Sequence, residues 1–241
     1  MSIGPENILI LTGAGISAES GLGTFREKGG LWERFDPQEL ATPEAFKRDP
    51  DKVLDFYNAR RKNLIGATPN PAHRALAELE QAWIMAGRGD FLLVTQNIDD
   101  LHEQAGSAQL LHMHGELLKT RCQLCGHLFA DTEDITTGRP CPGCGKAGGL
   151  RPHVVWFGEV PLGLDQIYAA LEQVDLFVAV GTSGTVYPAA GFVQEAKAAG
   201  AWTIELTLEP GEVSDLFDER LHGPASAVVP DWVRRKLETG S

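Results

Sequence analysis

Short apolar runs alternate with longer amphipathic segments along most of this chain, and this alternation is the strongest constraint on its fold. Each apolar run spans four or five residues, a usual length for a buried strand. Strands that alternate with helices in this way predict a parallel sheet with helices on both faces. The expected strands are Ile8–Leu11, Phe91–Thr95, Leu110–Met113, Leu176–Val180 and Thr203–Leu206, and the expected helices are Pro71–Ala82, Leu162–Val174 and Ala189–Ala199.

Two segments interrupt the alternation. Residues 27–70 are polar, with an expected amphipathic helix at Pro50–Leu64, and residues 115–155 are rich in Cys, Gly and Pro. We interpret both as insertions that form a smaller module, with a cleft between this module and the sheet. The predicted organisation is an α/β chain with a Rossmann-like domain of residues 1–26, 71–114 and 156–241, and a small helical and cysteine-rich module of residues 27–70 and 115–155.

All four cysteines lie in the second insertion, with the spacing C-x2-C-x15-C-x2-C. Each C-x2-C pair can present two thiolates from one tight turn, and two such pairs complete a tetrahedral site. Four thiolates leave no position open for a reacting water, so the spacing predicts a structural zinc ribbon. Two disulfides or four free thiols are the alternative. The expected zinc ligands are Cys122, Cys125, Cys141 and Cys144.

The charge and the apolar content restrict the classes of partner. The chain has 33 acidic against 21 basic residues, a net charge of -12, which disfavours nucleic acid because phosphate binding draws on clustered Lys and Arg. No apolar run approaches the roughly 18 residues of a membrane span. The start, MSIGPEN, has no pattern of a secretory signal. We expect a cytoplasmic protein, monomeric, with no nucleic-acid or membrane partner.

A glycine-rich loop follows the first expected strand. The stretch from Gly13 to Ala18 fits G-x-G-x-x-[GA], a pattern whose backbone N–H groups can hold a pyrophosphate. A dehydrogenase would place an acidic residue at the end of a second strand about 20 positions further on. Glu33 has that spacing but does not follow a strand-like run. The loop indicates a dinucleotide, and the alternatives are a dehydrogenase, a zinc-ribbon nucleic-acid-binding protein and a non-catalytic NAD sensor.

Six blocks stand out along the chain, in the order GAGISAESGLGTFR, TQNIDDLHEQAG, HMHG, the four cysteines, VVWFGE and GTSGTVYPAA. These blocks and their order resemble the sirtuins, which are NAD-dependent protein-lysine deacylases. The resemblance covers nearly the whole chain, and the element Tyr57-x-x-Arg60 is shared with bacterial class III sirtuins, which act on succinyl- and malonyl-lysine as well as acetyl-lysine.

The resemblance implies that NAD is a consumed co-substrate whose ribose receives the acyl group, with release of nicotinamide and O-acyl-ADP-ribose. Two positions depart from the family pattern, Gly23 and Thr207, and we expect a more mobile cover loop and weaker NAD binding from them. The implied NAD contacts are Gly13, Ala14, Gly15 and Ser17 in the loop, Phe25, Arg26 and Trp32 beyond it, Gln96, Asn97, Ile98 and Asp99 around the nicotinamide and its ribose, and Gly181, Thr182, Ser183, Thr207, Leu208, Glu209 and Ala225 toward the adenosine.

The resemblance also implies that His114 is the catalytic base, with Asn97 and Asp99 holding the nicotinamide amide. An imidazole with an ordinary pKa of about 6.5 is largely neutral at neutral pH and can accept a proton from the ribose hydroxyls. His112 is the other candidate in HMHG. We choose His114 by its position in the motif and expect His112 to point to the other side.

The acylated lysine is expected to bind as an added strand between the two modules. Tyr57 and Arg60 lie at i and i+3, so a helix would place them on one face where both can reach the carboxylate of a succinyl or malonyl group. An aromatic ring packed beneath a solvated arginine is the alternative interpretation. The expected substrate contacts are Tyr57, Arg60, Val154, Phe157, Gly158, Glu159, Gly184 and Val186.

Overall fold

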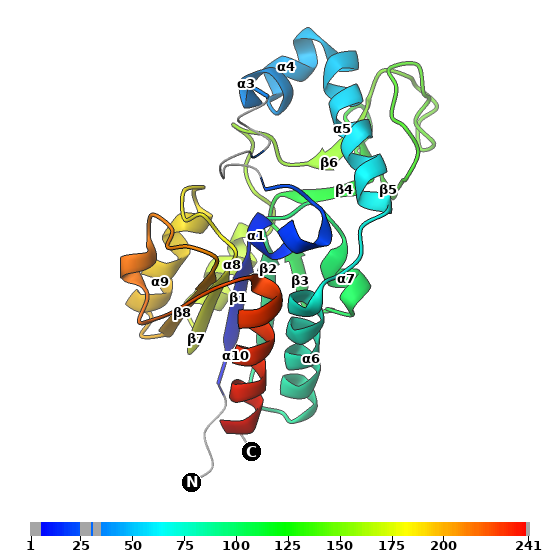
Figure 1. The fold of residues 1–241 in the computed structure, drawn as a ribbon. Helices are drawn as coiled ribbons and strands as arrows, with labels where there is room; N and C mark the ends of the chain where they lie inside the picture. The colour runs from blue at the N-terminus through cyan, green and yellow to red at the C-terminus, as the bar shows by residue number, and fades with distance from the viewer. Residues whose placement is uncertain (1–5, 25–29, 31–34, 240–241) are drawn as a thin grey trace.

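The computed structural model describes residues 6–24, 30 and 35–239, and its centre is a parallel sheet of six strands (Figure 1). The strand order is β3-β2-β1-β7-β8-β9, and every neighbouring pair is parallel. The central strands are buried along their whole length because helices cover both faces of the sheet. The strands are β1 (Ile8–Thr12), β2 (Phe91–Thr95), β3 (Leu110–His112), β7 (Leu176–Val180), β8 (Trp202–Thr207) and β9 (Glu219–His222).

Alternate side chains of each central strand point to opposite faces and belong to two separate cores. Ile8 and Ile10 pack with α6 and α10, which lie side by side in Figure 1, while Leu9 and Leu11 pack with α8 and α9. These helices are α6 (Pro71–Met85), α10 (Ala225–Thr239), α8 (Leu164–Leu171) and α9 (Phe192–Ala198). The shorter segments are α1 (Ala14–Ser17), η1 (Ala18–Ser20), α7 (Leu101–Ala105), η2 (Ala189–Gly191) and η3 (Ser214–Leu216).

The predicted fold class, a Rossmann-like parallel sheet with helices on both faces, is confirmed. The five predicted strands are present to within one residue at either end. The predicted helix over residues 162–174 is shorter, as α8, and the one over residues 189–199 begins with the 3-10 turn η2 before α9. β9 and α10 were not predicted: β9 alternates between half-buried and exposed residues, and α10 contains Pro230, a residue type that commonly breaks a helix.

The two insertions build a second body with its own core (Figure 1). Its helices follow one another closely, and each begins with a side-chain cap, Asp36, Thr42 or Asp49, followed by a proline at the first helical position. They pack near an antiparallel sheet of order β5-β4-β6. The elements are α3 (Pro37–Leu40), α4 (Pro43–Arg48), α5 (Pro50–Ile65), β4 (Gly115–Cys122), β5 (Leu128–Ala130) and β6 (Leu150–Val154).

The strand order places a ligand crevice at one point of the large sheet. The chain runs from β1 to β2 and β3 on one side and continues with β7, β8 and β9 on the other, so the order reverses between β1 and β7. Parallel sheets bind ligands outside the carboxyl ends of the strands at such a point. Within the described part of the chain, no helix has the length and apolar character needed to cross a bilayer.

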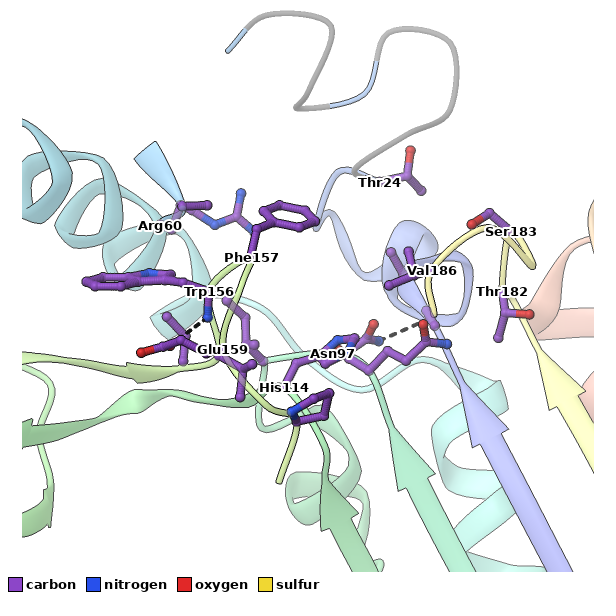
Figure 2. A pocket seen from close by; sticks show the side chains of 18 of the residues that line it. Thr24, Arg60, Asn97, His114, Trp156, Phe157, Glu159, Thr182, Ser183 and Val186 are labelled. Carbon is purple, nitrogen blue, oxygen red and sulfur yellow. Dashed lines mark hydrogen bonds between the residues drawn. The ribbon is translucent and has the colours of Figure 1, made fainter. Parts of the chain in front are cut away.

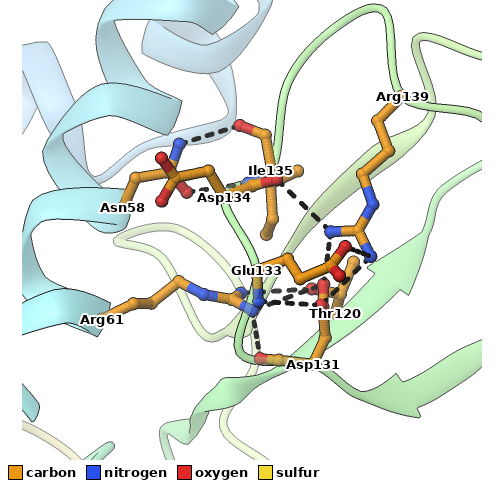
Figure 3. A network of polar contacts seen from close by, with 8 residues as sticks. All are labelled: Asn58, Arg61, Thr120, Asp131, Glu133, Asp134, Ile135 and Arg139. Atoms are coloured by element: carbon orange, nitrogen blue, oxygen red, sulfur yellow. Dashed lines mark hydrogen bonds and ion pairs between the residues drawn. The ribbon is translucent and has the colours of Figure 1, made fainter. Parts of the chain in front are cut away.

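A buried ion-pair network holds α5 against the small sheet (Figure 3). The Arg61 side chain is 1% exposed, and its guanidinium lies 3.3 Å from the carboxylate of Asp131. Arg139 donates to both carboxylate oxygens of Asp131, at 2.9 and 3.1 Å. On the same helix, Asn58 exchanges two hydrogen bonds of 2.9 Å with the backbone of Ile135. The Asp131 carboxylate therefore pairs with two guanidinium groups and compensates the charge of Arg61, which is fully buried.

We expect Asp131→Ala to destabilise the small module strongly. Loss of the carboxylate leaves the buried Arg61 charge uncompensated, which typically costs about 3–5 kcal/mol. Glu133→Ala is the matched control, because Glu133 also pairs with Arg139 but its side chain is 79% exposed. The control should change the free energy of unfolding by about 0–1 kcal/mol. Urea unfolding of the two variants measures the difference, and similar small losses would contradict a stabilising role for the network.

Candidate active site

A cavity of about 270 Å³ lies at the carboxyl ends of β1, β2 and β7, where the large sheet meets the small module (Figure 2). Most of the residues predicted for NAD or substrate contribute to its wall. They are Gly13, Ala14, Gly15, Tyr57, Arg60, Gln96, Asn97, Ile98, His114, Val154, Phe157, Gly158, Glu159, Gly181, Thr182, Ser183 and Val186. Phe25, Arg26, Trp32 and Glu33, which the sequence analysis also named, lie outside the described residues.

The glycine loop after β1 lies directly against the loop after β7. The N–H of Gly13 donates to the carbonyl of Val180, and the N–H of Gly15 donates to the carbonyl of Gly181, both at 2.9 Å. A Cβ atom on Gly13 would lie 2.8 Å from the Gly181 oxygen, and one on Gly15 would lie 2.8 Å from the Gly181 Cα. Only glycine permits this approach, which brings Ala14 and Thr182 to the same wall of the cavity.

Three predicted NAD contacts are joined by hydrogen bonds. The Asn97 amide donates to the carbonyl of Gly13 and to the hydroxyl of Ser17, both at 3.1 Å. The Ser17 hydroxyl in turn donates to the Asp99 carboxylate at 3.0 Å. Burial raises the pKa of Asp99, although Leu101 N–H and Ser17 donate to its carboxylate. Ser17 and Asp99 line a smaller cavity of about 80 Å³ that adjoins the main one and shares Ala14, Asn97 and other residues with it.

His114 lies at the wall of the main cavity, close to Asn97 (Figure 2). Its Nδ1 is 3.0 Å from the carbonyl oxygen of Gln96. A carbonyl only accepts, so Nδ1 carries the proton and Nε2 is the free acceptor of a neutral ring. Burial lowers the pKa of His114. The ring is therefore neutral at neutral pH and can act as a base through Nε2.

His112, unlike His114, is not among the residues that line the cavity. Its Nε2 is 2.7 Å from the Glu103 carboxylate on α7. Simple strand alternation does not explain this, because side chains two positions apart in a strand share a face. β3 ends at His112, and the chain turns at Met113 and His114 before β4 begins.

The expected acyl end of the cavity is formed by α5 and the segment after β6. The Tyr57 oxygen accepts a hydrogen bond from the indole N–H of Trp156 at 3.0 Å, and burial raises the pKa of Tyr57 to about 12. The guanidinium of Arg60 lies 5.7 Å from the ring centre of Phe56, and burial lowers the pKa of Arg60. Tyr57 and Arg60 line the cavity together, as the helical spacing predicted.

The carboxylate of Glu159 is engaged within the protein. It forms ion pairs with Arg151 at 2.8 Å and Arg121 at 3.0 Å, and it accepts the backbone N–H of Trp156 at 2.9 Å. The fully buried Arg151 guanidinium also lies 3.2 Å from the ring centre of Trp156. Sequence reasoning missed Arg151 and Trp156, although the clustering of VVWFGE after β6 was a signal for the second of them.

The residues predicted for the adenosine end are only partly brought together. Gly184, which was predicted as a substrate contact, has a φ of +68° and lies against Val213, in a neighbouring hollow. Thr207 is buried at the end of β8, and its hydroxyl oxygen has no hydrogen-bond partner among the described residues. Such an atom fits a polar ligand group. Thr207, Leu208, Glu209 and Ala225 do not line the main cavity, so their contact with NAD stays a prediction.

The four cysteines form one cluster. Their sulfur atoms all lie within 4.8 Å of one another, with Cys122 to Cys144 at 4.0 Å and Cys125 to Cys141 at 3.8 Å. A tetrahedral zinc site with bonds of about 2.3 Å requires sulfur atoms about 3.8 Å apart. None of the four forms a disulfide, which removes the alternative of two disulfides. The donor set fits a closed, structural zinc site.

Comparisons with known proteins agree with this fold and site. The Sir2 family model matches residues 13–188. A relative from Caulobacter vibrioides, an NAD-dependent protein deacylase, is 56% identical over 97% of this chain and 98% of its own length. A solved Sir2 homologue in complex with NAD is 40% identical, with a TM-score of 0.87 over 98% of this chain and 91% of that one. A Sir2 variant solved with a deacetylated peptide and 3′-O-acetyl ADP-ribose is 27% identical, with a TM-score of 0.79 over 97% and 93% of the two chains.

Fold and site together define an enzyme that uses NAD as a co-substrate at the edge of a Rossmann-like sheet. The chain belongs to the Sir2 family. Its activity is NAD-dependent protein deacylation, as in its close relatives.

Replacement of Cys141 by serine should remove the zinc and unfold the small module, because a structural zinc contributes folding free energy directly. His127→Ala is the matched control, since His127 lies beside the cluster but stacks on Phe129 and is not one of the grouped ligands. Metal analysis should find about one zinc per chain in the wild type and the control, as a closed four-thiolate site binds one ion. Zinc-free wild-type protein that is folded and active would contradict the assignment.

Proposed function

We propose that this enzyme removes succinyl and malonyl groups, as well as acetyl groups, from protein lysines and releases nicotinamide and O-acyl-ADP-ribose. One observation carries the proposal: Tyr57 and Arg60 line the same cavity as His114. A related structure that holds a deacetylated peptide and 3′-O-acetyl ADP-ribose supports the nature of the products. We further propose that the enzyme works as a cytoplasmic monomer.

His114 acts as the general base through Nε2, which its hydrogen bond to the Gln96 carbonyl leaves as an acceptor. The proton comes from the hydroxyl groups of the NAD ribose. Asn97 and Asp99 hold the nicotinamide amide, and their mutual contact through Ser17 fixes their orientation. The remaining predicted contacts of the glycine loop and of the loop after β7 hold the pyrophosphate and the adenosine.

Tyr57 and Arg60 select acyl groups that end in a carboxylate. The Tyr57 oxygen already accepts the Trp156 N–H, so the phenol is set to donate its own hydrogen. Its raised pKa keeps it protonated at neutral pH. Arg60 supplies the positive charge, and hydrogen bonds between charged groups contribute roughly 1.5–3 kcal/mol. Acetyl-lysine lacks the carboxylate but still fits, so deacetylation is retained.

The acylated peptide binds as an extended strand between the two modules. Phe157, Gly158 and Glu159 lie on one side of the cavity and Val186 on the other. Strand pairing uses backbone groups and tolerates many side chains. Because the Glu159 carboxylate is bonded to Arg151 and Arg121, its contribution to the peptide comes from the backbone.

His114→Ala should lower the turnover number by about 10²–10⁴-fold, the usual cost of losing a general base. His127→Ala is the control, because His127 is exposed beside the cysteine cluster and is not among the residues that line the cavity. In the wild type, activity should fall as the pH falls through the pKa of His114, which burial places below the ordinary value of about 6.5. Near-normal turnover of the variant in steady-state assays would exclude His114 as the base.

Arg60→Met should reduce kcat/KM for a succinyl-lysine peptide by about 10- to 100-fold, the rate equivalent of a lost charged hydrogen bond. The same variant should change kcat/KM for the matched acetyl-lysine peptide much less. Arg48→Met, at an exposed arginine of the same module that pairs with Glu39, should leave both values unchanged. Equal losses on the two peptides in the Arg60 variant would show that Arg60 supports structure and does not choose the acyl group.

A further inference from the structure

A second histidine, His112, contacts the segment that carries the proposed nicotinamide contacts. Its side chain is 8% exposed, at the end of β3. Its Nδ1 lies 3.1 Å from the carbonyl oxygen of Asn97, and its Nε2 lies 2.7 Å from the carboxylate of Glu103. The ring therefore bridges the segment after β2 to helix α7.

Both ring nitrogens of His112 must donate. A carbonyl oxygen and an ionised carboxylate are acceptors only, so a ring that bonds both carries two protons and a positive charge. Burial lowers the pKa of His112, but the hydrogen bond and charge of Glu103 outweigh burial and raise it overall. The titratable groups that face the ring are Glu103 and His102 on α7, Asp99 before α7, and Glu116 with its ion-pair partner Lys119 on β4.

The two histidines of HMHG form hydrogen bonds with the backbone carbonyl groups of two consecutive residues. His114 bonds the carbonyl of Gln96, and His112 bonds the carbonyl of Asn97. The backbone between these two contacts carries the Asn97 side chain, which then bonds Gly13 and Ser17. The orientation of the Asn97 side chain thus depends on two contacts. His112 holds the Asn97 backbone carbonyl, and the glycine loop holds the Asn97 side-chain amide.

We propose that His112 is a positioning residue: as an imidazolium paired with Glu103, it fixes the Asn97 carbonyl and thereby holds the Asn97 side chain in place for nicotinamide. The inference rests on the proposed role of Asn97 and adds a residue outside the cavity to the machinery. The positioning role requires the bond from Nδ1 to the Asn97 carbonyl. The bond from Nε2 to Glu103 keeps the ring charged and oriented.

Two substitutions separate the two bonds. His112→Asn places an amide nitrogen near the position of Nδ1 and can keep the bond to Asn97, while His112→Gln reaches toward the position of Nε2 and can keep only the bond to Glu103. The Gln variant should raise KM for NAD and the inhibition constant of nicotinamide by about 10- to 100-fold, as expected for a misplaced binding group. The Asn variant should stay within about threefold of the wild type in both constants, because the bond to the carbonyl is kept.

Glu103→Gln tests the charge separately, at a side chain that is 41% exposed. The imidazolium is present below the pKa of His112 and is lost as the pH rises through it. Wild-type KM for NAD should therefore rise as the pH rises through the pKa of His112, which Glu103 raises above its ordinary value. Glu103→Gln should shift this rise to lower pH because the carboxylate that raises the pKa is gone. His112→Asn, which has no proton to lose, should not show the rise.

Equal effects of His112→Asn and His112→Gln on KM for NAD would overturn the proposal, whether both variants lose affinity or neither does. An unshifted pH profile in Glu103→Gln would overturn the imidazolium assignment. The thermal unfolding midpoint of each of the three variants is measured as well. If the rise in KM for NAD simply follows the fall in the unfolding midpoint, the effect is structural, and the positioning role of His112 would also be overturned. A failure of the proposed function would be detected in a different experiment, because the His114→Ala variant would then keep full turnover.

Discussion

The site depends on one contact between backbones, the approach of the loop after β1 to the loop after β7. Gly15 donates to the Gly181 carbonyl at 2.9 Å, and a Cβ atom on Gly181 would lie 2.4 Å from the Ile16 nitrogen. Any side chain at these glycines would separate the two strands at the point where the sheet order reverses. The Asn97 amide is bonded to the Gly13 carbonyl, so a displaced loop would also release the segment after β2.

The second constraint is the placement of two adjacent arginines on α5. Successive residues of a helix are turned by about 100°, so Arg60 and Arg61 leave the helix in different directions. Arg61 enters the core of the small module, where Asp131 neutralises it. Arg60 lines the cavity. The pairing of Arg61 thus fixes the rotation of the helix, and that rotation presents Tyr57 and Arg60 to the proposed acyl group.

The sequence was most informative where a local pattern is enough to specify the structure. Apolar runs located five of the six described strands of the large sheet, and the cysteine spacing located a cluster whose sulfur atoms do lie at distances suited to zinc. Long-range contacts were not accessible in this way. Arg151 is fully buried and joins Glu159 to Trp156, but an arginine in RPHVV carries no local sign of burial. α10 was missed because Pro230 lies inside it, and tertiary packing of Val229 and Val233 overrides that propensity.

The charge distribution explains how an acidic enzyme can accept anionic ligands. A net charge of -12 opposes both NAD and a succinyl group at long range, but salt screens exposed charges beyond about 8–10 Å. Inside the cavity the balance is local: Arg60 is the one Arg or Lys among the described residues of its wall, and the Glu159 carboxylate there is neutralised by Arg151. Among the described residues of the cavity wall, the proposed anionic acyl group would therefore meet one Arg or Lys side chain and no unpaired carboxylate. Since Arg60 stands on α5, the proposed acyl preference would depend on the small module, while the proposed chemistry of NAD would depend on the loops of the large sheet.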